Sequence, residues 1–239
     1  MPTDLSNWTF RPGTWDEAIV RSCVDGNEYG LPDKLEPDDL VIDIGAHIGG
    51  FAHAAWLRGS RDIWCYEPFL SNFDLLVRNL EPHLDSFVLR RRAMWHTDGQ
   101  MMYSDGAESR ENTGGVDFFA MTGSWYARSV NLDDIIGFIG GDIRFLKLDC
   151  EGAEFPILLT SNRLSRVQEI SLEYHEMGTG REDDPFPDIP EVARIDDRNA
   201  YRAEDLIAHL EQQGFKMVRT HRHGTHGTSR LGFLQMRRG

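Results

Sequence analysis

The 239-residue sequence lacks the features that mark membrane and disulfide-stabilised proteins. Its apolar runs stay far below the roughly 18 residues that suggest a membrane span, and no basic stretch followed by an apolar core opens the chain. Three cysteines, Cys23, Cys65 and Cys150, are odd in number and form no C-x-x-C pair. This usage predicts a reducing compartment and no structural zinc. We therefore expect a soluble, cytoplasmic protein with no membrane partner.

Positive charge is also scarce, because 25 Lys and Arg stand against 39 Asp and Glu, for a net charge of −14. Nucleic acid is disfavoured as a partner, since binding phosphates requires Lys and Arg. The charge is compatible with a cationic acceptor, although solubility alone accounts for the same value. The chain also lacks repeats and low-complexity tracts, and its length suits one α/β domain.

A further absence is the G-x-G-x-x-G fingerprint of nicotinamide and flavin sites. In its place, residues 40–51 read as a buried strand, a turn at Gly45 and a helix opened by Gly49 and Gly50. Backbone N–H groups at such a turn can approach a ligand closely, so we expect a small molecule across it. The alternative is an ordinary strand-to-helix turn in which Asp43 serves as a capping group.

The second expected strand, residues 62–68, ends in Glu67 and Pro68. An acid at this strand end can accept both hydrogen bonds from a ribose diol, although a solvated surface charge is the alternative. The helix of residues 71–80 follows, with Ser71 as its expected N-cap.

A third strand is expected over residues 86–92. Ala93, Met94 and Trp95 follow it and could line the adenine side of the pocket, although Trp95 also suits a core position. Residues 100–130 read as an inserted hairpin or extended segment.

The chain from residue 143 to residue 154 forms the second informative stretch, a buried strand that ends in Asp149 and continues into Glu151 and Glu154. Three carboxylates at one strand end repel each other unless they hold a cation, a donor-rich ligand or a proton, and capping is an equal alternative for Glu151 and Glu154. The fifth strand, residues 167–176, carries Glu173 and His175 with the same parity. Because parallel strands deliver their carboxyl ends to one edge, we expect this pair to face Asp149.

The remaining segments frame this core. Residues 1–39 form a preface whose aromatic side chains Trp8, Phe10 and Trp15 either pack on the core or close over a pocket. Residues 177–200 form a long acidic loop that we interpret as an acceptor-binding lid, with a surface excursion as the alternative. A helix over residues 201–213 and two final strands in a hairpin complete the chain. The connection from His221 to His226 suits a metal site less well than ordinary loop histidines.

Four stretches together resemble the FkbM family of methyltransferases: residues 43–51, 66–68, 130–134 and 146–154. The resemblance implies a Rossmann-like class I methyltransferase fold over residues 40–239, with a seven-stranded mostly parallel sheet, an antiparallel C-terminal hairpin and helices on both faces. It also implies S-adenosylmethionine as cofactor and a small-molecule acceptor. The cofactor-binding residues expected on this basis are Asp43, Gly45, His47, Gly49, Glu67, Pro68, Asn72, Ala93, Trp95 and Asp149.

The usual activity of the family implies O-methylation of a sugar or natural-product hydroxyl. Alcohols are very weak acids, so a base or a divalent ion must assist the loss of the proton. The candidate catalytic residues are Asp149, Glu151, Glu173 and His175. Mg²⁺ held by Asp149, Glu173 and His175 is one expectation, and His175 as an unaided general base is the other.

Three other functions stay open at this point. N-methylation of an amino sugar or aminocyclitol would need less activation of the acceptor. A nicotinamide oxidoreductase is opposed by the missing glycine fingerprint, and a non-catalytic cofactor-binding module is opposed by the presence of Glu67 and Asp149. The oligomeric state also stays open, with a homodimer as one alternative.

Overall fold

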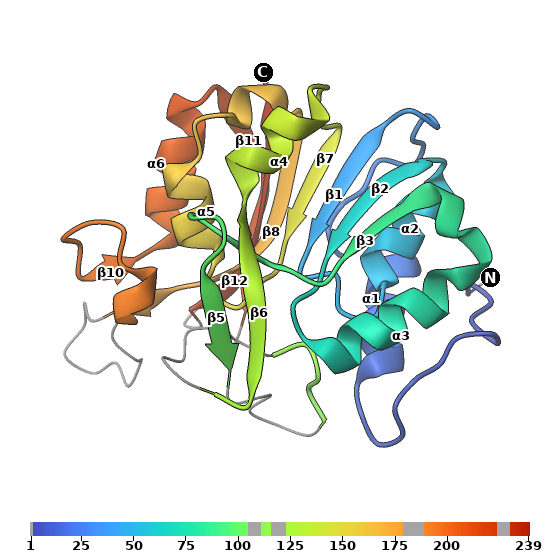
Figure 1. Cartoon of the computed structure of the whole chain (residues 1–239). Coiled ribbons are helices and arrows are strands. Elements are labelled where there is room, and N and C mark those ends of the chain that lie inside the picture. The colour runs from blue at the N-terminus through green and yellow to red at the C-terminus, as the bar shows by residue number, and fades with distance from the viewer. Residues whose placement is uncertain (1, 105–110, 116–122, 179–188, 224–229) are drawn as a thin grey trace.

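The computed structural model describes residues 2–104, 111–115, 123–178, 189–223 and 230–239. At its centre lies a seven-stranded sheet with the strand order β11-β12-β8-β7-β1-β2-β3 (Figure 1). The five strands from β8 to β3 run parallel, β12 pairs antiparallel with β8, and β11 pairs antiparallel with β12. These strands are β1 (Leu40–Ile44), β2 (Asp62–Tyr66), β3 (Phe87–Arg90), β7 (Phe145–Leu148), β8 (Glu169–His175), β11 (Phe215–Arg222) and β12 (Leu231–Arg238). The expected mostly parallel sheet with an antiparallel C-terminal hairpin is confirmed.

In the described part of the chain, helices cover both faces of the sheet (Figure 1). The helices α1 (Asp16–Val24), α2 (Gly50–Arg58) and α3 (Leu70–Leu80) share one hydrophobic core, and α4 (Leu132–Ile139), α5 (Glu154–Thr160) and α6 (Ala203–Gln212) share the other. Strand β1 divides its side chains between the two cores, because successive residues point to opposite faces. Ile42 and Ile44 face α4 to α6, whereas Val41 faces α1 to α3. The alternation therefore directs Asp43 to the side of α1 to α3.

A smaller sheet of three strands lies beside the main one. In it β4 (Ala93–Trp95) pairs parallel with β6 (Trp125–Asn131), and β5 (Met101–Ser104) pairs antiparallel with β6. The strand expected over residues 86–92 is therefore shorter, because the chain leaves the main sheet after Arg90. The side chain of Asn131 caps α4 by accepting from the N–H groups of Asp133 and Asp134. Ser71 is not an N-cap as expected, since α3 begins at Leu70 after Phe69.

The segments outside the two sheets are short. The described part of residues 177–201 contains a two-stranded ribbon of β9 (Met177–Gly178) and β10 (Ala200–Tyr201), together with the 3₁₀ turn η3 (Glu191–Ala193). Residues 179–188 of the expected acidic lid lie outside the described residues. Two further 3₁₀ turns are η1 (Glu81–Ser86) and η2 (Leu164–Arg166). In the described part of the chain, no helix has the length and apolar character to cross a membrane. The cytoplasmic location and the division at residue 40 stay predictions.

Candidate active site

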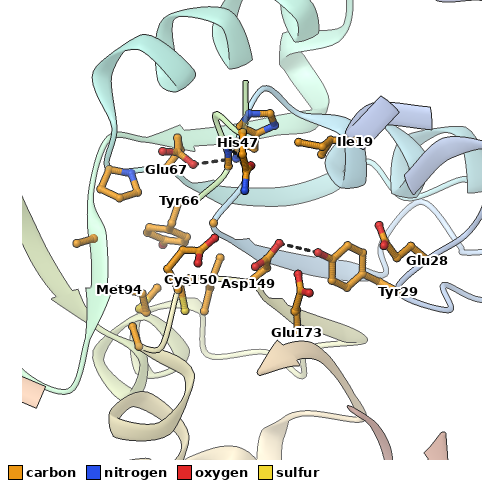
Figure 2. A pocket seen from close by; sticks show the side chains of 18 of the residues that line it. Ile19, Glu28, Tyr29, His47, Tyr66, Glu67, Met94, Asp149, Cys150 and Glu173 are labelled. Atoms are coloured by element: carbon orange, nitrogen blue, oxygen red, sulfur yellow. Dashed lines mark hydrogen bonds between the residues drawn. The ribbon is translucent and has the colours of Figure 1, made fainter. Parts of the chain in front are cut away.

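A cavity of about 410 Å³ opens at the carboxyl ends of β1, β2, β7 and β8 (Figure 2). Nine of the residues expected in the site line it: Gly45, His47, Glu67, Pro68, Ala93, Trp95, Asp149, Glu151 and Glu173. Figure 2 shows Glu67 and Met94 on one side, Glu28 and Tyr29 on the other, and Asp149 between them. The rule that parallel strands deliver their carboxyl ends to one edge thus brings together residues separated by more than a hundred positions.

Gly45 sits where no other residue fits. Its φ is +74°, and a Cβ at this position would lie 1.7 Å from the carbonyl oxygen of Asp149. The N–H groups of Gly45 and Ala46 both donate to the carbonyl of Tyr66, at 2.9 and 3.1 Å. The turn is therefore held between β2 and the end of β7. A side chain at Gly45 would force the end of β1 away from the end of β7.

Beneath this turn lies a buried ion pair that the sequence analysis did not identify. Lys147 Nζ is 3.1 Å from Asp43 Oδ1, and the two side chains are 3% and 0% exposed. The ammonium also donates to the carbonyl oxygens of Gly45 at 2.6 Å and Ile44 at 3.3 Å. Burial raises the pKa of Asp43, with Lys147 opposing. Asp43 is not among the described lining residues, so its expected role in cofactor binding would act through Lys147 and the turn.

Glu67 is a buried carboxylate whose direction is fixed by the backbone. Its Oε2 accepts from the N–H of His47 at 2.8 Å, and its Oε1 accepts from the N–H of Phe69 at 2.9 Å. Burial is the main cause that raises its pKa to about 7. The side chain of Asn72 is a further hydrogen-bond partner. Because the two oxygens of a carboxylate can accept about four hydrogen bonds in all, Glu67, which lines the cavity, keeps capacity for a donor on a ligand.

Gly49 and Asn72, two other expected cofactor residues, lie behind the cavity wall. Gly49 is the N-cap of α2 with a φ of +103°, and a Cβ there would lie 3.1 Å from Leu76 Cδ1. Asn72 donates to the carbonyl of Thr113 at 3.0 Å and accepts from Arg11 Nη1 at 2.8 Å. Both residues therefore support the wall, and neither is among its described lining residues.

Asp149 projects into the cavity and is oriented by a residue of the preface. The hydroxyl of Tyr29 donates to Asp149 Oδ2 at 2.7 Å (Figure 2). Burial raises the pKa of Tyr29 well above its usual value, so the phenol stays a neutral donor. The ring packs edge-on against Phe51 and Phe233. One oxygen of Asp149 is thus held by Tyr29, and no donor among the described residues binds the second.

His175 lies between two carboxylates, Glu151 Oε2 at 3.1 Å from Nε2 and Glu154 Oε1 at 3.4 Å from Nδ1. Burial alone would lower its pKa, but the two acids raise it well above the usual value. An imidazolium has no lone pair to accept a proton, so this arrangement disfavours His175 as an unaided general base. Glu154 also accepts from the N–H groups of Cys150 and Gly152, so it holds the turn before α5, which has no side-chain cap.

One candidate metal group occurs among the described residues. Ligand atoms of Asp149, Glu151 and His175 lie within 4.8 Å of one another. The set shares Asp149 and His175 with the expected one, and Glu151 takes the place of Glu173. Binding a cation there requires His175 to release its proton.

Glu173 faces the cavity beside Asp149 and contacts the C-terminal hairpin. Its Oε1 lies 3.0 Å from His223 Nε2. Burial first, and then the negative charge of Asp149, raises the pKa of Glu173 to about 8. His223 belongs to the histidine-rich connection noted in the sequence, whereas His226 lies outside the described residues.

The preface forms part of the cavity wall, which is one of the two roles that the sequence left open for it. Trp15, Ile19, Ser22, Glu28 and Tyr29 all line the cavity. Trp8 and Phe10 instead stack on each other, and Trp8 packs edge-on against His53 of α2. The aromatic side chains of the preface thus divide between the two expected roles. Among the described residues that line the cavity, five are Asp or Glu and none is Lys or Arg.

Comparison with known proteins gives the fold and the family. The FkbM methyltransferase from Methylobacillus flagellatus KT is 15% identical with a TM-score of 0.51, and the match covers 87% of this chain and 45% of that one. A putative rRNA methylase from Clostridium thermocellum is 8% identical with a TM-score of 0.51, over 90% of this chain and 94% of that one. No curated protein matches the sequence. The model of the methyltransferase FkbM domain matches residues 43–217, which is most of the sequence, so the chain belongs to the FkbM methyltransferase family.

Proposed function

We propose that the cavity binds S-adenosylmethionine and that the protein transfers its methyl group to a hydroxyl of a sugar or natural-product small molecule. The observation that carries the proposal is Glu67, a buried carboxylate aimed by two backbone N–H groups beside the Gly45 turn. A carboxylate held in this way suits the hydroxyls of a ribose, which are hydrogen-bond donors. The lining fits the rest of the cofactor, because buried Ala93, Met94 and Met102 offer an apolar surface to a flat base. The carboxylates suit a ligand that carries sulfonium and ammonium charges.

The test is calorimetry with S-adenosylhomocysteine on the wild type and on Glu67→Gln. Gln keeps the size but has one acceptor oxygen where Glu has two, so we expect affinity to fall about tenfold or more, as for a lost hydrogen bond to a charged group. Glu81→Gln, an exposed acid on η1, is the matched control and should bind as the wild type does. Equal affinity of Glu67→Gln and wild type would show that the ribose assignment is wrong.

The methyl acceptor would occupy the side of the cavity lined by Asp149 and Glu173. In-line displacement needs the acceptor aligned with the donated methyl group and relieved of its proton. We assign proton acceptance to Asp149 and to the ionised form of Glu173, because both face the cavity. With a pKa of about 8, the Glu173 carboxylate is a stronger base than an ordinary one, but most of it is protonated at pH 7 and must ionise first. His175 would orient Glu151 through their 3.1 Å contact.

Assistance by a divalent ion such as Mg²⁺ is a separate part of the proposal. Asp149, Glu151 and His175 would hold it, and its charge would lower the pKa of an acceptor hydroxyl. The check is titration of Mg²⁺ alone into the wild type and Glu151→Gln by calorimetry, together with activity in EDTA. Activity that survives EDTA, with no heat of binding, would contradict metal assistance.

N-methylation of an amino sugar or aminocyclitol is the second candidate. It is favoured by the five carboxylates and the lack of Lys or Arg among the described lining residues, because such a wall attracts an ammonium group. The same wall disfavours RNA as acceptor. Turnover of matched pairs, each a sugar and its amino derivative, separates the candidates, since O-methylation persists on the neutral member and N-methylation does not.

A further inference from the structure

A buried polar network joins four segments behind the cavity wall. At its centre Asp16, 0% exposed, accepts from the side chain and the backbone N–H of Arg11, each bond 2.9 Å long. Asp16 Oδ1 also accepts from the hydroxyl of Thr113 at 2.6 Å. The Thr113 hydroxyl in turn lies 2.8 Å from His47 Nε2, and Asn72 bonds both Thr113 and Arg11. Asp16 thus joins the preface to residues 111–115 directly, and Arg11 and Thr113 extend the network to α3 and the Gly45 turn.

The network determines which nitrogen of His47 carries its proton. Hydrogen bonds to Arg11 and Thr113 outweigh burial and lower the pKa of Asp16 to about 2, so Asp16 is an anion that can only accept. The single hydroxyl hydrogen of Thr113 must then point to Asp16. The 2.8 Å contact with His47 is therefore a bond donated by Nε2–H to the Thr113 oxygen, since two lone pairs would repel. Arg11 Nη2 also lies near His47 Nε2, at 3.3 Å. Because this distance is longer than the 2.8 Å contact with Thr113, we assign the hydrogen bond of Nε2 to Thr113.

His47 is neutral in this arrangement, because burial lowers its pKa to about 4. Its Nδ1 then has a lone pair, and this buried atom has no hydrogen-bond partner among the described residues. His47 lines the cavity, and its backbone N–H binds Glu67. A buried acceptor without a partner costs free energy, which a donor on a bound ligand would recover.

We propose that Asp16 is a positioning residue for the cofactor: through Thr113 it fixes the Nε2–H tautomer of His47, so that Nδ1 accepts a hydrogen bond from an N–H or O–H group of bound S-adenosylmethionine. The proposal rests on the function proposed above. It also gives the preface a role in cofactor binding, because Asp16 and Arg11 belong to a part of the chain that precedes the residues matched by the family model.

The same contacts fix the wall around His47. The N–H of Trp15, next to Asp16, donates to the carbonyl of Glu111 at 2.9 Å. Asn112 and Gly114, on either side of Thr113, line the cavity, as does Trp15. Loss of the Asp16 to Thr113 bond would therefore alter both the tautomer and this wall, and the experiment must separate the two.

The experiment records long-range ¹⁵N–¹H spectra of ¹⁵N-histidine protein at pH 7, with His47→Gln to assign His47. We expect the neutral Nε2–H tautomer in the wild type and a change of the Nδ1 resonance when S-adenosylhomocysteine is added. Thr113→Val removes the hydroxyl at constant shape; we expect a mixed tautomer and about tenfold weaker binding by calorimetry, the effect of one hydrogen bond. Thr113→Ser restores the hydroxyl and with it the tautomer and the affinity.

Thr160→Val is the matched control, since its hydroxyl bonds the carbonyl of Pro156 on α5, away from the network. A loss that Thr160→Val shares would reflect general stability and would overturn the proposal. An Nδ1–H tautomer of His47 in the wild-type spectrum would also overturn the proposal. This measurement uses the wild type, so it does not depend on whether a variant folds. If the wild type and Thr113→Val bind S-adenosylhomocysteine equally well, this inference alone is overturned. Wild type that does not bind S-adenosylhomocysteine overturns the proposed function and this inference together.

Discussion

Replacing Lys147 by Met tests whether the ion pair below the Gly45 turn holds the site in place. Met is close to Lys in volume but carries no charge, so the variant leaves the fully buried carboxylate of Asp43 without its partner. Breaking a buried pair in this way costs about 3–5 kcal/mol. The donor to the carbonyl of Gly45 is lost as well, which adds about 1 kcal/mol. Since a domain is stable by only about 5–15 kcal/mol, we expect a large fall in the free energy of unfolding.

Asp43→Asn should cost less, because Lys147 keeps its bonds to the carbonyls of Gly45 and Ile44 and lies near Asp149. In the double variant Asp43→Asn/Lys147→Met no charge stays buried at the pair. The loss of unfolding free energy in the double variant should therefore be smaller than the sum of the two single losses by about 2 kcal/mol or more. This difference is within the range of coupling between contacting residues.

The assay is urea unfolding followed by circular dichroism at 25 °C, with the slope compared between variants to confirm two-state behaviour. Acidification gives an internal check on Lys147→Met. Burial already raises the pKa of Asp43, and loss of Lys147 removes the opposing charge. The folded variant then binds a proton that the unfolded chain releases above about pH 4. Its free energy of unfolding should rise, relative to the wild type, as pH is lowered from 8 to 5.

Two results would refute the reasoning about this pair. If Lys147→Met lowers the free energy of unfolding by less than about 1 kcal/mol, the pair contributes no more than an exposed ion pair does. Additive losses in the double variant would show that the two charges do not interact. Either outcome would leave the Gly45 turn to be held by its backbone bonds alone.

Three further changes test other parts of the site. Gly45→Ala should cost at least about 3 kcal/mol in thermal unfolding, from the left-handed φ and the clash with the Asp149 carbonyl, and normal stability would contradict it. Asp16→Asn should cost about 2 kcal/mol above pH 4, a difference that shrinks as pH falls from 4 through about 2, the folded pKa of Asp16; a difference independent of pH would refute this. Tyr29→Phe should raise the KM of the acceptor several-fold with little change in stability, measured by initial rates, because only the bond to Asp149 is lost.

The strand ends were predictable because they follow from local pattern and one topological rule. An apolar run that ends in an acid predicts a buried parallel strand, and parallel strands share one edge for their carboxyl ends. These two statements suffice to bring Glu67, Asp149 and Glu173 to one cavity. They say nothing of side-chain rotamers or protonation states. Two findings of the structure could therefore not be predicted: His175 lies between acids that favour its cationic form, and Glu151, not Glu173, joins it in the candidate metal group.

Lys147 was missed although the sequence holds a signal for it. Asp43 and Lys147 are charged residues in otherwise apolar strands, and they are register partners in neighbouring β1 and β7. Two charges buried on adjacent strands must be paired, because neither can remain alone in the core. The order of strands that aligns the two residues comes from the structure.

Asp16, Tyr29 and Thr113 carried no such signal. Tyr29 bonds a residue 120 positions away, and Asp16 bonds one 97 positions away, and no periodicity links either pair. Each contact depends on how the preface and residues 111–115 fold onto the carboxyl edge of the sheet, which is a matter of tertiary packing. The main sheet provides the edge at which the cavity opens, whereas the partners of His47 and Asp149 come from residues 111–115 and the preface. The segments that pattern analysis describes least well are therefore those in which this chain's own specificity should be sought.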